Sequence, residues 1–178
     1  MTSETPTAWD AIQKKLDVMP KPTQVLKLCA DADIRDRYQI TKVALANAEE
    51  YLRTLPKDLD KEARAQVVQQ TKDARAAFLA AQGDYEENTV TLTFKALERD
   101  QLKDLIAAHP PTEEDEAKGD EFNFDTFAPT LIATASTDGM PLEYAQNAVR
   151  TWALTDSRDL WNAAWGVQQR RRTDLGKD

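Results

Sequence analysis

The longest regular pattern in the chain is a heptad repeat of apolar and small residues. Between residues 34 and 81 they recur at alternating intervals of four and three, the spacing of a seam between two packed helices. Leu55-Pro56-Lys57-Asp58 interrupts the repeat and predicts the turn between the helices. The predicted seam consists of Ile34, Tyr38, Thr41, Leu45, Ala48, Leu52 and Leu55 on the first helix and Ala63, Val67, Gln70, Ala74, Ala77 and Ala81 on the second.

We therefore expect a long antiparallel helical hairpin over about residues 32–82. Asp31 or Asp33 can cap the start of its first helix, and Gly83 is expected to end the second. The second seam is rich in alanine, which lets helices approach closely but buries little apolar area. The charged residues of the hairpin are expected to form its solvated outer face.

Two short segments beside the hairpin have the pattern of β-strands. Residues 24–30 form an apolar run bounded by turn residues. In residues 88–94, threonines alternate with apolar residues, the period of a strand with one buried and one solvated face. Two strands alone are marginally stable, so they must either pair with each other under a helix or extend a sheet in a partner. The predicted fold class is α+β, predominantly α-helical.

The last third of the chain predicts a cluster of short helices. A preceding helix must end at His109-Pro110-Pro111, because neither proline can continue it. The acidic stretch that follows is expected to be a mobile loop. Three short helical runs come next, the first starting at Asp125 or Thr126 with Pro129 in its first turn. Ser157 is expected to cap the third run, and these helices carry three of the four tryptophans.

These elements predict five segments. They are an N-terminal arm (1–23), a domain of strand, hairpin, strand and helix (24–108), an acidic linker (109–123), a C-terminal helical cluster (124–170) and a basic tail (171–178). Within the arm, Trp9, Ile12 and Leu16 recur at helical spacing and predict a short amphipathic helix. Pro20-Lys21-Pro22 then favours an extended backbone.

Composition narrows the classes of function. The 178 residues include 23 basic and 31 acidic side chains, a formal net charge of −8 that disfavours sequence-independent nucleic-acid binding. No apolar run is long enough for a transmembrane helix, and the first residues lack the pattern of a secretory signal. One cysteine and one histidine exclude an internal disulfide framework and leave little for zinc. We expect a cytoplasmic protein with no cofactor, nucleic acid or membrane as partner.

The residues that could carry catalysis or bind metal do not match a known template. His109 is the only histidine and abuts two prolines at a helix end. Cys29 lies in an apolar strand and is expected to be a small buried hydrophobe. The cluster Glu113-Glu114-Asp115-Glu116 lacks the alternating oxygens and the turn glycine of a calcium loop. We therefore expect no enzyme, and we assign no catalytic, metal-binding or cofactor-binding residue.

Aromatic residues remain as candidates for contact with a partner, because such residues are the usual anchors of protein interfaces. The candidates are Phe122, Phe124, Phe127, Trp152, Trp161 and Trp165. For the phenylalanines and for the tryptophans, the alternative is burial in the core of the helical cluster. Three surfaces compete as the partner-binding face: the terminal helices, the run from Phe122 to Phe127, and the seam of the hairpin.

One stretch resembles a known family. It consists of Leu-Ile-Ala-Ala-His-Pro-Pro-Thr at 105–112, an acidic spacer, and Phe-Asn-Phe-Asp-Thr-Phe-Ala-Pro-Thr-Leu-Ile-Ala-Thr at 122–134. This stretch is similar to the tail assembly chaperones of siphophages from actinobacterial phages and prophages. The likeness continues through Met-Pro-Leu-Glu at 140–143 and Trp-Asn-Ala-Ala-Trp at 161–165. The upstream order, a short strand with a cysteine and then a charged hairpin, also looks like that family.

The resemblance implies a non-enzymatic protein of the host cytoplasm that is absent from the finished virion. It would bind the long, aggregation-prone tape measure protein and help the tail tube protein to polymerise around it. The family commonly makes a longer product by ribosomal frameshifting, and Leu175-Gly176-Lys177 can be encoded by codons that contain the slippery heptamer G-GGA-AAG. The alternatives are a structural minor or connector protein of the tail, or an unrelated coiled-coil adaptor. Self-association is open, since the seam allows either an internal hairpin or a helix exchanged between protomers.

Overall fold

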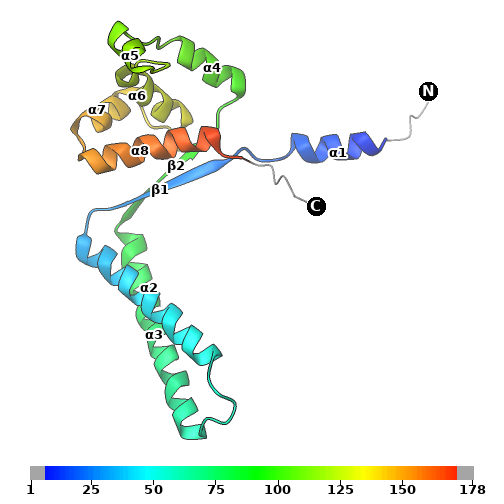
Figure 1. Cartoon of the computed structure of the whole chain (residues 1–178), viewed down its shortest axis with the longest axis vertical. Helices are drawn as coiled ribbons and strands as arrows, with labels where there is room; N and C mark the ends of the chain where they lie inside the picture. Colours follow the sequence, from blue (N-terminus) through cyan, green and yellow to red (C-terminus); the bar gives the residue numbers. More distant parts are fainter. Residues whose placement is uncertain (1–6, 172–178) are drawn as a thin grey trace. The chain divides into compact units, whose positions relative to one another are not determined.

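The computed structural model describes residues 7–171, in which helices dominate and two strands form the only sheet (Figure 1). The predicted α+β, predominantly helical fold class is confirmed. Residues 1–6 of the arm and 172–178 of the basic tail, including Leu175-Gly176-Lys177, lie outside the described residues. The elements are α1 (Ala8–Asp17), β1 (Thr23–Cys29), α2 (Ala32–Arg53), α3 (Lys61–Glu87), β2 (Thr89–Lys95), α4 (Arg99–Ala107), α5 (Glu113–Lys118), α6 (Phe124–Ala135), α7 (Leu142–Thr151), α8 (Leu154–Gly166) and a 3₁₀ turn, η1 (Val167–Gln169).

The chain forms two compact units, and the boundary between them falls inside the strands. Lys27–Thr91 form one unit, and the described residues on either side of this range form the other. The predicted domain of residues 24–108 is therefore divided between the two units. α4 and the parts of β1 and β2 that lie outside Lys27–Thr91 belong with the C-terminal helices. The cause is packing, because Leu26, Leu92 and Leu97 contact the core of those helices.

The two strands pair with each other in an antiparallel ribbon, the first of the two predicted alternatives. At one end of the ribbon the N–H of Ala96 donates to the carbonyl oxygen of Pro22 at 2.9 Å. The turn after α6 adds to the edge of β2, where Thr137 donates its N–H to the carbonyl oxygen of Thr93 at 2.9 Å. The carboxylate of Asp138 in turn accepts the N–H of Thr93 at 2.7 Å. Backbone hydrogen bonds thus anchor β2 to the C-terminal unit.

The second unit is the predicted helical hairpin, in which α2 packs along α3 (Figure 1). The carboxylate of Asp31 caps α2 by accepting the N–H of Ile34 at 3.0 Å. The six predicted seam residues that lie in α2 are partly buried, as is Leu55 just after its end. On α3 the predicted seam is wrong at Gln70 and Ala77, which are exposed, whereas Thr71 is buried and Phe78 is partly buried.

The seam of α3 combines aromatic residues with the alanines Ala74 and Ala81. Phe78 lies 5.8 Å from Tyr38 between ring centroids, and Tyr85 stacks on Tyr38 at 4.5 Å. Because Tyr85 lies beyond Gly83, α3 runs through this glycine to Glu87, and the predicted end of the hairpin near residue 82 is wrong. A helical glycine costs about 1 kcal/mol relative to alanine. The stacked ring and the burial it brings offset this cost.

The core of the C-terminal unit forms around Phe94 of β2. This side chain is 0% exposed and lies among α6, α7 and α8. Most of its neighbours are alanines, which let the three helices approach closely while one large ring fills the space between them. The buried members of this core are Phe94, Ile132, Ala135, Ala145, Ala148, Leu160, Ala163, Ala164 and Val167.

Truncation of Phe94 tests this account of the core. Phe94→Ala should lower the free energy of unfolding by about 3–5 kcal/mol, the usual cost of removing a fully buried ring. Val90 lies on the same strand but is 61% exposed, so Val90→Ala should cost less than about 1 kcal/mol. Urea denaturation measures both values, and equal losses in the two variants would contradict the assignment.

A second pair of variants tests the register of the hairpin. Phe78 packs on Tyr38, whereas its neighbour Leu79 is 59% exposed. Phe78→Ala should therefore destabilise α2 and α3 by about 1–3 kcal/mol, and Leu79→Ala by no more than about 0.5 kcal/mol. Hydrogen exchange of the amides of both helices provides the measurement. The reverse order would contradict the register through Phe78.

Candidate functional site

Five of the six predicted aromatic residues come together at one end of the C-terminal unit. The rings of Phe122 and Phe127 lie 4.2 Å apart between centroids, and both pack against Trp161 and Trp165. Phe124 meets the ring of Trp161 at 5.0 Å. Trp152 is separate and packs instead against Tyr144 at 6.4 Å.

Helical spacing brings these rings into contact. Trp161 and Trp165 lie four residues apart on α8, so their rings stack with centroids 5.4 Å apart. Phe124 and Phe127 lie three apart at the start of α6, a helix capped by Asn123, whose side chain accepts the N–H of Thr126 at 3.2 Å. The predicted cap at Asp125 or Thr126 is wrong, and Pro129 consequently lies beyond the first turn. α6 packs directly on α8.

The aromatic cluster is partly core and partly surface. Phe127 is 0% exposed, whereas Phe122, Trp161 and Trp165 are partly buried. Phe124 keeps 43% of its surface exposed. The two alternatives considered from the sequence, core and interface, therefore both apply, each to different members of the cluster. Two members of the cluster, Phe124 and Trp161, line a hollow in the surface.

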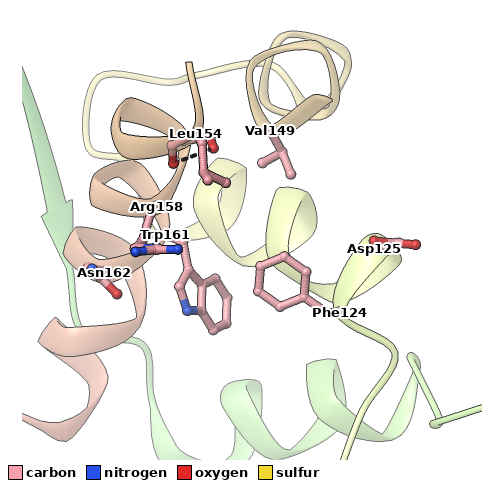
Figure 2. Close-up of a pocket in the computed structure, with 8 residues that line it drawn as sticks. Phe124, Asp125, Val149, Leu154, Arg158, Trp161 and Asn162 are labelled. Carbon is pink, nitrogen blue, oxygen red and sulfur yellow. Dashed lines mark hydrogen bonds between the residues drawn. The ribbon is translucent and has the colours of Figure 1, made fainter. Parts of the chain in front are cut away.

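That hollow is a groove of about 520 Å³ between α6, α7 and α8. Figure 2 shows the rings of Phe124 and Trp161 next to each other in it, with Val149 and Leu154 lying nearby. Leu154 begins α8 and is 73% exposed. We call this site the α6–α8 groove, and it is lined by Phe124, Asp125, Val149, Leu154, Ser157, Arg158, Trp161 and Asn162.

The α6–α8 groove carries one acidic and one basic side chain on opposite sides. Asp125 lies beside Phe124, and Arg158 lies beyond Trp161 (Figure 2). A more polar hollow of about 740 Å³ adjoins it and shares Asp125 and Val149 with it. An apolar floor between opposite charges is suited to an amphipathic helix, which carries an apolar stripe with charged borders.

Three groove residues do not stand out in the sequence. Val149 and Leu154 fit the apolar stripes of their helices, and Arg158 resembles any charged residue on a solvated face. Ser157 is not the predicted cap of α8: the helix begins at Leu154, with Ala153 at the cap position, and Ser157 lies inside it, donating to the carbonyl oxygen of Leu154 at 3.1 Å. The earlier start turns Leu154 into a helical residue at the rim of the groove.

The acidic segment predicted as a mobile linker contains helix α5. Thr112 and Asp115 form a reciprocal cap: the N–H of Thr112 donates to the Asp115 carboxylate at 2.9 Å, and its hydroxyl does so at 2.7 Å. Gly119 ends the helix with a φ of 83°, a conformation that favours glycine. The segment also delivers Phe122 to the aromatic cluster, so it is an ordered part of this surface.

His109 and Cys29 were considered for catalysis from the sequence, and both are packed against other parts of the fold. His109 packs its ring edge against Phe127 at 6.1 Å, and Cys29 is buried at the end of β1. Within residues 7–171, no three His, Cys, Asp or Glu side chains lie close enough to hold a metal ion. Nor does any helix in the described part of the chain have the length and apolar character to cross a membrane.

Thr112 controls the titration of Asp115. Its backbone N–H and then its hydroxyl stabilise the carboxylate, with a smaller contribution from Lys118, and these interactions hold the pKa of Asp115 below its ordinary value. A lowered pKa means that the cap stabilises α5 at neutral pH. This contribution is lost as the pH falls below about 3.9, the ordinary value for aspartate, and through the lowered pKa.

We therefore expect α5 to fray in acid. Amide chemical shifts of residues 113–118 should move toward coil values as the pH falls through the pKa of Asp115. Asp115→Asn should produce the frayed shifts already at neutral pH, because the amide is a weaker acceptor for the N–H of Thr112. Glu121→Gln, outside the helix, is the control and should leave the transition unchanged.

No protein-family model, curated protein or solved structure matches the chain.

Proposed function

We propose that this protein acts by holding another polypeptide, and that it is a phage tail assembly chaperone whose client is the tape measure protein. The observation that carries the proposal is the α6–α8 groove, where Phe124, Leu154 and Trp161 offer apolar surface to solvent. Aromatic and large aliphatic side chains in a groove are the usual anchors for a bound helix. A tape measure protein, long, helical and partly apolar, presents many such helices.

The position of the family-like residues supports the same proposal. The stretch at 122–134 contains most of α6, and the stretch at 105–112 precedes it in the chain. The stretch at 161–165 lies on α8. Their aromatic members Phe122, Phe124, Trp161 and Trp165 pack on one another. Two of these stretches thus supply residues that line the groove, namely Phe124, Asp125, Trp161 and Asn162.

The charge of the chain is also compatible with a chaperone. A net charge of −8 keeps a protein with exposed apolar side chains soluble and discourages its own aggregation. One acidic and one basic residue beside the groove leave the apolar contacts to supply most of the affinity. Such contacts can be broken and re-formed. This is needed if the client must later be released for tail tube assembly.

A structural minor or connector protein of the tail is the second candidate. The hairpin favours it, because α2 and α3 form a self-contained unit with an ion pair between Arg75 and Glu49 on its outer face. Mass spectrometry of purified virions separates the two: a connector is present in fixed copy number, whereas a chaperone is absent. A coiled-coil adaptor unrelated to phages would be favoured by a gene that lies outside any phage or prophage cluster.

Co-expression with a tape measure protein, which the proposal expects to be encoded beside this gene, tests the proposal. The chain should keep the tape measure protein in the soluble fraction and be recovered with it. Leu154→Asp should weaken that binding by at least about tenfold, since it places a charge at the rim of the apolar groove. Leu154 is 73% exposed, so the variant should fold.

Ile40→Asp provides the matched control. Ile40 is 68% exposed on α2, away from the seam, and its replacement should leave capture of the tape measure protein unchanged. Loss of binding in the Ile40 variant alone would move the client site to the hairpin. A tape measure protein that stays insoluble beside the wild-type chain would contradict the proposed function itself.

A further inference from the structure

Helix α1 is an amphipathic helix whose apolar face is exposed. Trp9 is 60% exposed, Ile12 and Leu16 are 50% exposed, and Val18 and Met19, which follow the helix, are exposed as well. The helix is well defined at its start, where Thr7 and Asp10 cap each other. A helix of 10 residues is marginal in water on its own. This apolar face therefore needs a surface on which to pack.

The borders of that face carry opposite charges. With about 3.6 residues per turn, Trp9, Ile12 and Leu16 share one side of α1. Asp10 and Asp17 fall on one border of this side, and Lys15 falls on the other. The apolar stripe of α1 thus lies between an acidic and a basic border.

The α6–α8 groove has the complementary arrangement. Its apolar residues Phe124 and Trp161 lie between Arg158 on one side and Asp125 on the other (Figure 2). A helix placed with its apolar stripe on these rings can direct an acidic border to Arg158 and a basic border to Asp125. In α1 those borders are provided by Asp17 and Lys15.

The attachment of α1 favours the groove of another copy over its own. Only Pro20 separates Met19, whose N–H is bonded to Leu16, from Lys21, which pairs with Glu98. The strand that follows is held by Arg170, which donates to the carbonyl oxygen of Thr23 at 2.8 Å. Arg170 follows the 3₁₀ turn after α8, whereas Leu154 begins α8, about 18 Å from its last residue, Gly166, at the rise of a helix. The short tether thus holds the base of α1 near the C-terminal end of α8, away from Leu154 at the opposite end of the helix.

We propose that α1 of one copy docks into the α6–α8 groove of a second copy. Trp9, Ile12 and Leu16 pack on the side chains of Phe124, Leu154 and Trp161 of the other copy. Asp17 faces its Arg158, and Lys15 faces its Asp125. Reciprocal exchange of two α1 helices closes a dimer with a two-fold axis and uses both apolar faces at once. The interaction requires no client and does not depend on the proposed function.

Sedimentation of the purified full-length chain over a range of concentrations tests the exchange. An interface made of one short helix per copy is small, so a dimer with a Kd on the order of tens of micromolar is expected. Leu16→Asp should weaken dimerisation by at least about tenfold, because it places a charge in the apolar stripe. Lys14 lies on the opposite side of α1, and Lys14→Ala is the control that should dimerise normally.

Mixing two defective variants identifies the occupant of the groove. Leu16→Asp lacks a competent α1 and Leu154→Asp lacks a competent groove, so neither should dimerise alone. Together they retain one intact pair, α1 of the Leu154 variant and the groove of the Leu16 variant, and should form a one-to-one complex. Docking of α1 within a single chain could not produce such a complex. Asp17→Arg and Arg158→Asp should each weaken the dimer, and the two combined in one chain should restore it.

Several outcomes would overturn the inference. They are a wild-type chain that stays monomeric at every concentration, a dimer that Leu16→Asp leaves intact, and variants that do not complement each other. Binding of α1 to anionic lipid vesicles by a strictly monomeric chain would assign the helix to a membrane surface instead. Capture of the tape measure protein is scored separately: Leu16→Asp should retain it, so failure of the exchange and failure of the proposed function give different results.

Discussion

The C-terminal unit depends on the burial of one ring among small side chains. Phe94 enters from β2 and fills the space between α6, α7 and α8, whose facing positions are mostly alanine. Small residues allow the helices to lie close together, and the ring of Phe94, with Ile132 and Leu160, supplies the apolar area that the alanines lack. The same three helices carry every residue that lines the α6–α8 groove, so the core around Phe94 also determines the spacing of the groove walls.

The hairpin is a compact unit by itself and is stabilised by a different set of contacts. Its seam combines small residues with Tyr38, Phe78 and Tyr85, whose rings pack across the two helices. Thr71 is buried within it and satisfies its hydroxyl by donating to the carbonyl oxygen of Val67 at 2.9 Å. The hairpin is thus stabilised by its own contacts, and the only chain connections to the other unit are the two paired strands.

Patterns within single elements were predictable from the sequence, whereas contacts between elements were not. The seam of α2 and both strands follow from periodicity, because each is set by which face of one element is buried. The seam of α3 failed at Gln70 and Ala77 because two registers of a heptad fit its alanines equally well, and only Tyr38 on the facing helix selects the one through Phe78. The aromatic residues Phe124 and Trp161 were identified as candidates, but the groove they share with Leu154 and Arg158 arises from the crossing of α6 and α8, which no local pattern encodes.

The central claim is that the α6–α8 groove receives a helix of another polypeptide. Hydrogen exchange of the chain, diluted until it is monomeric, with and without the tape measure protein, addresses this most directly. The account predicts slower exchange in the first turns of α6 and α8 when the client is present, and unchanged exchange on the exposed face of α2. Protection confined to the hairpin, with α6 and α8 unaffected, would contradict it.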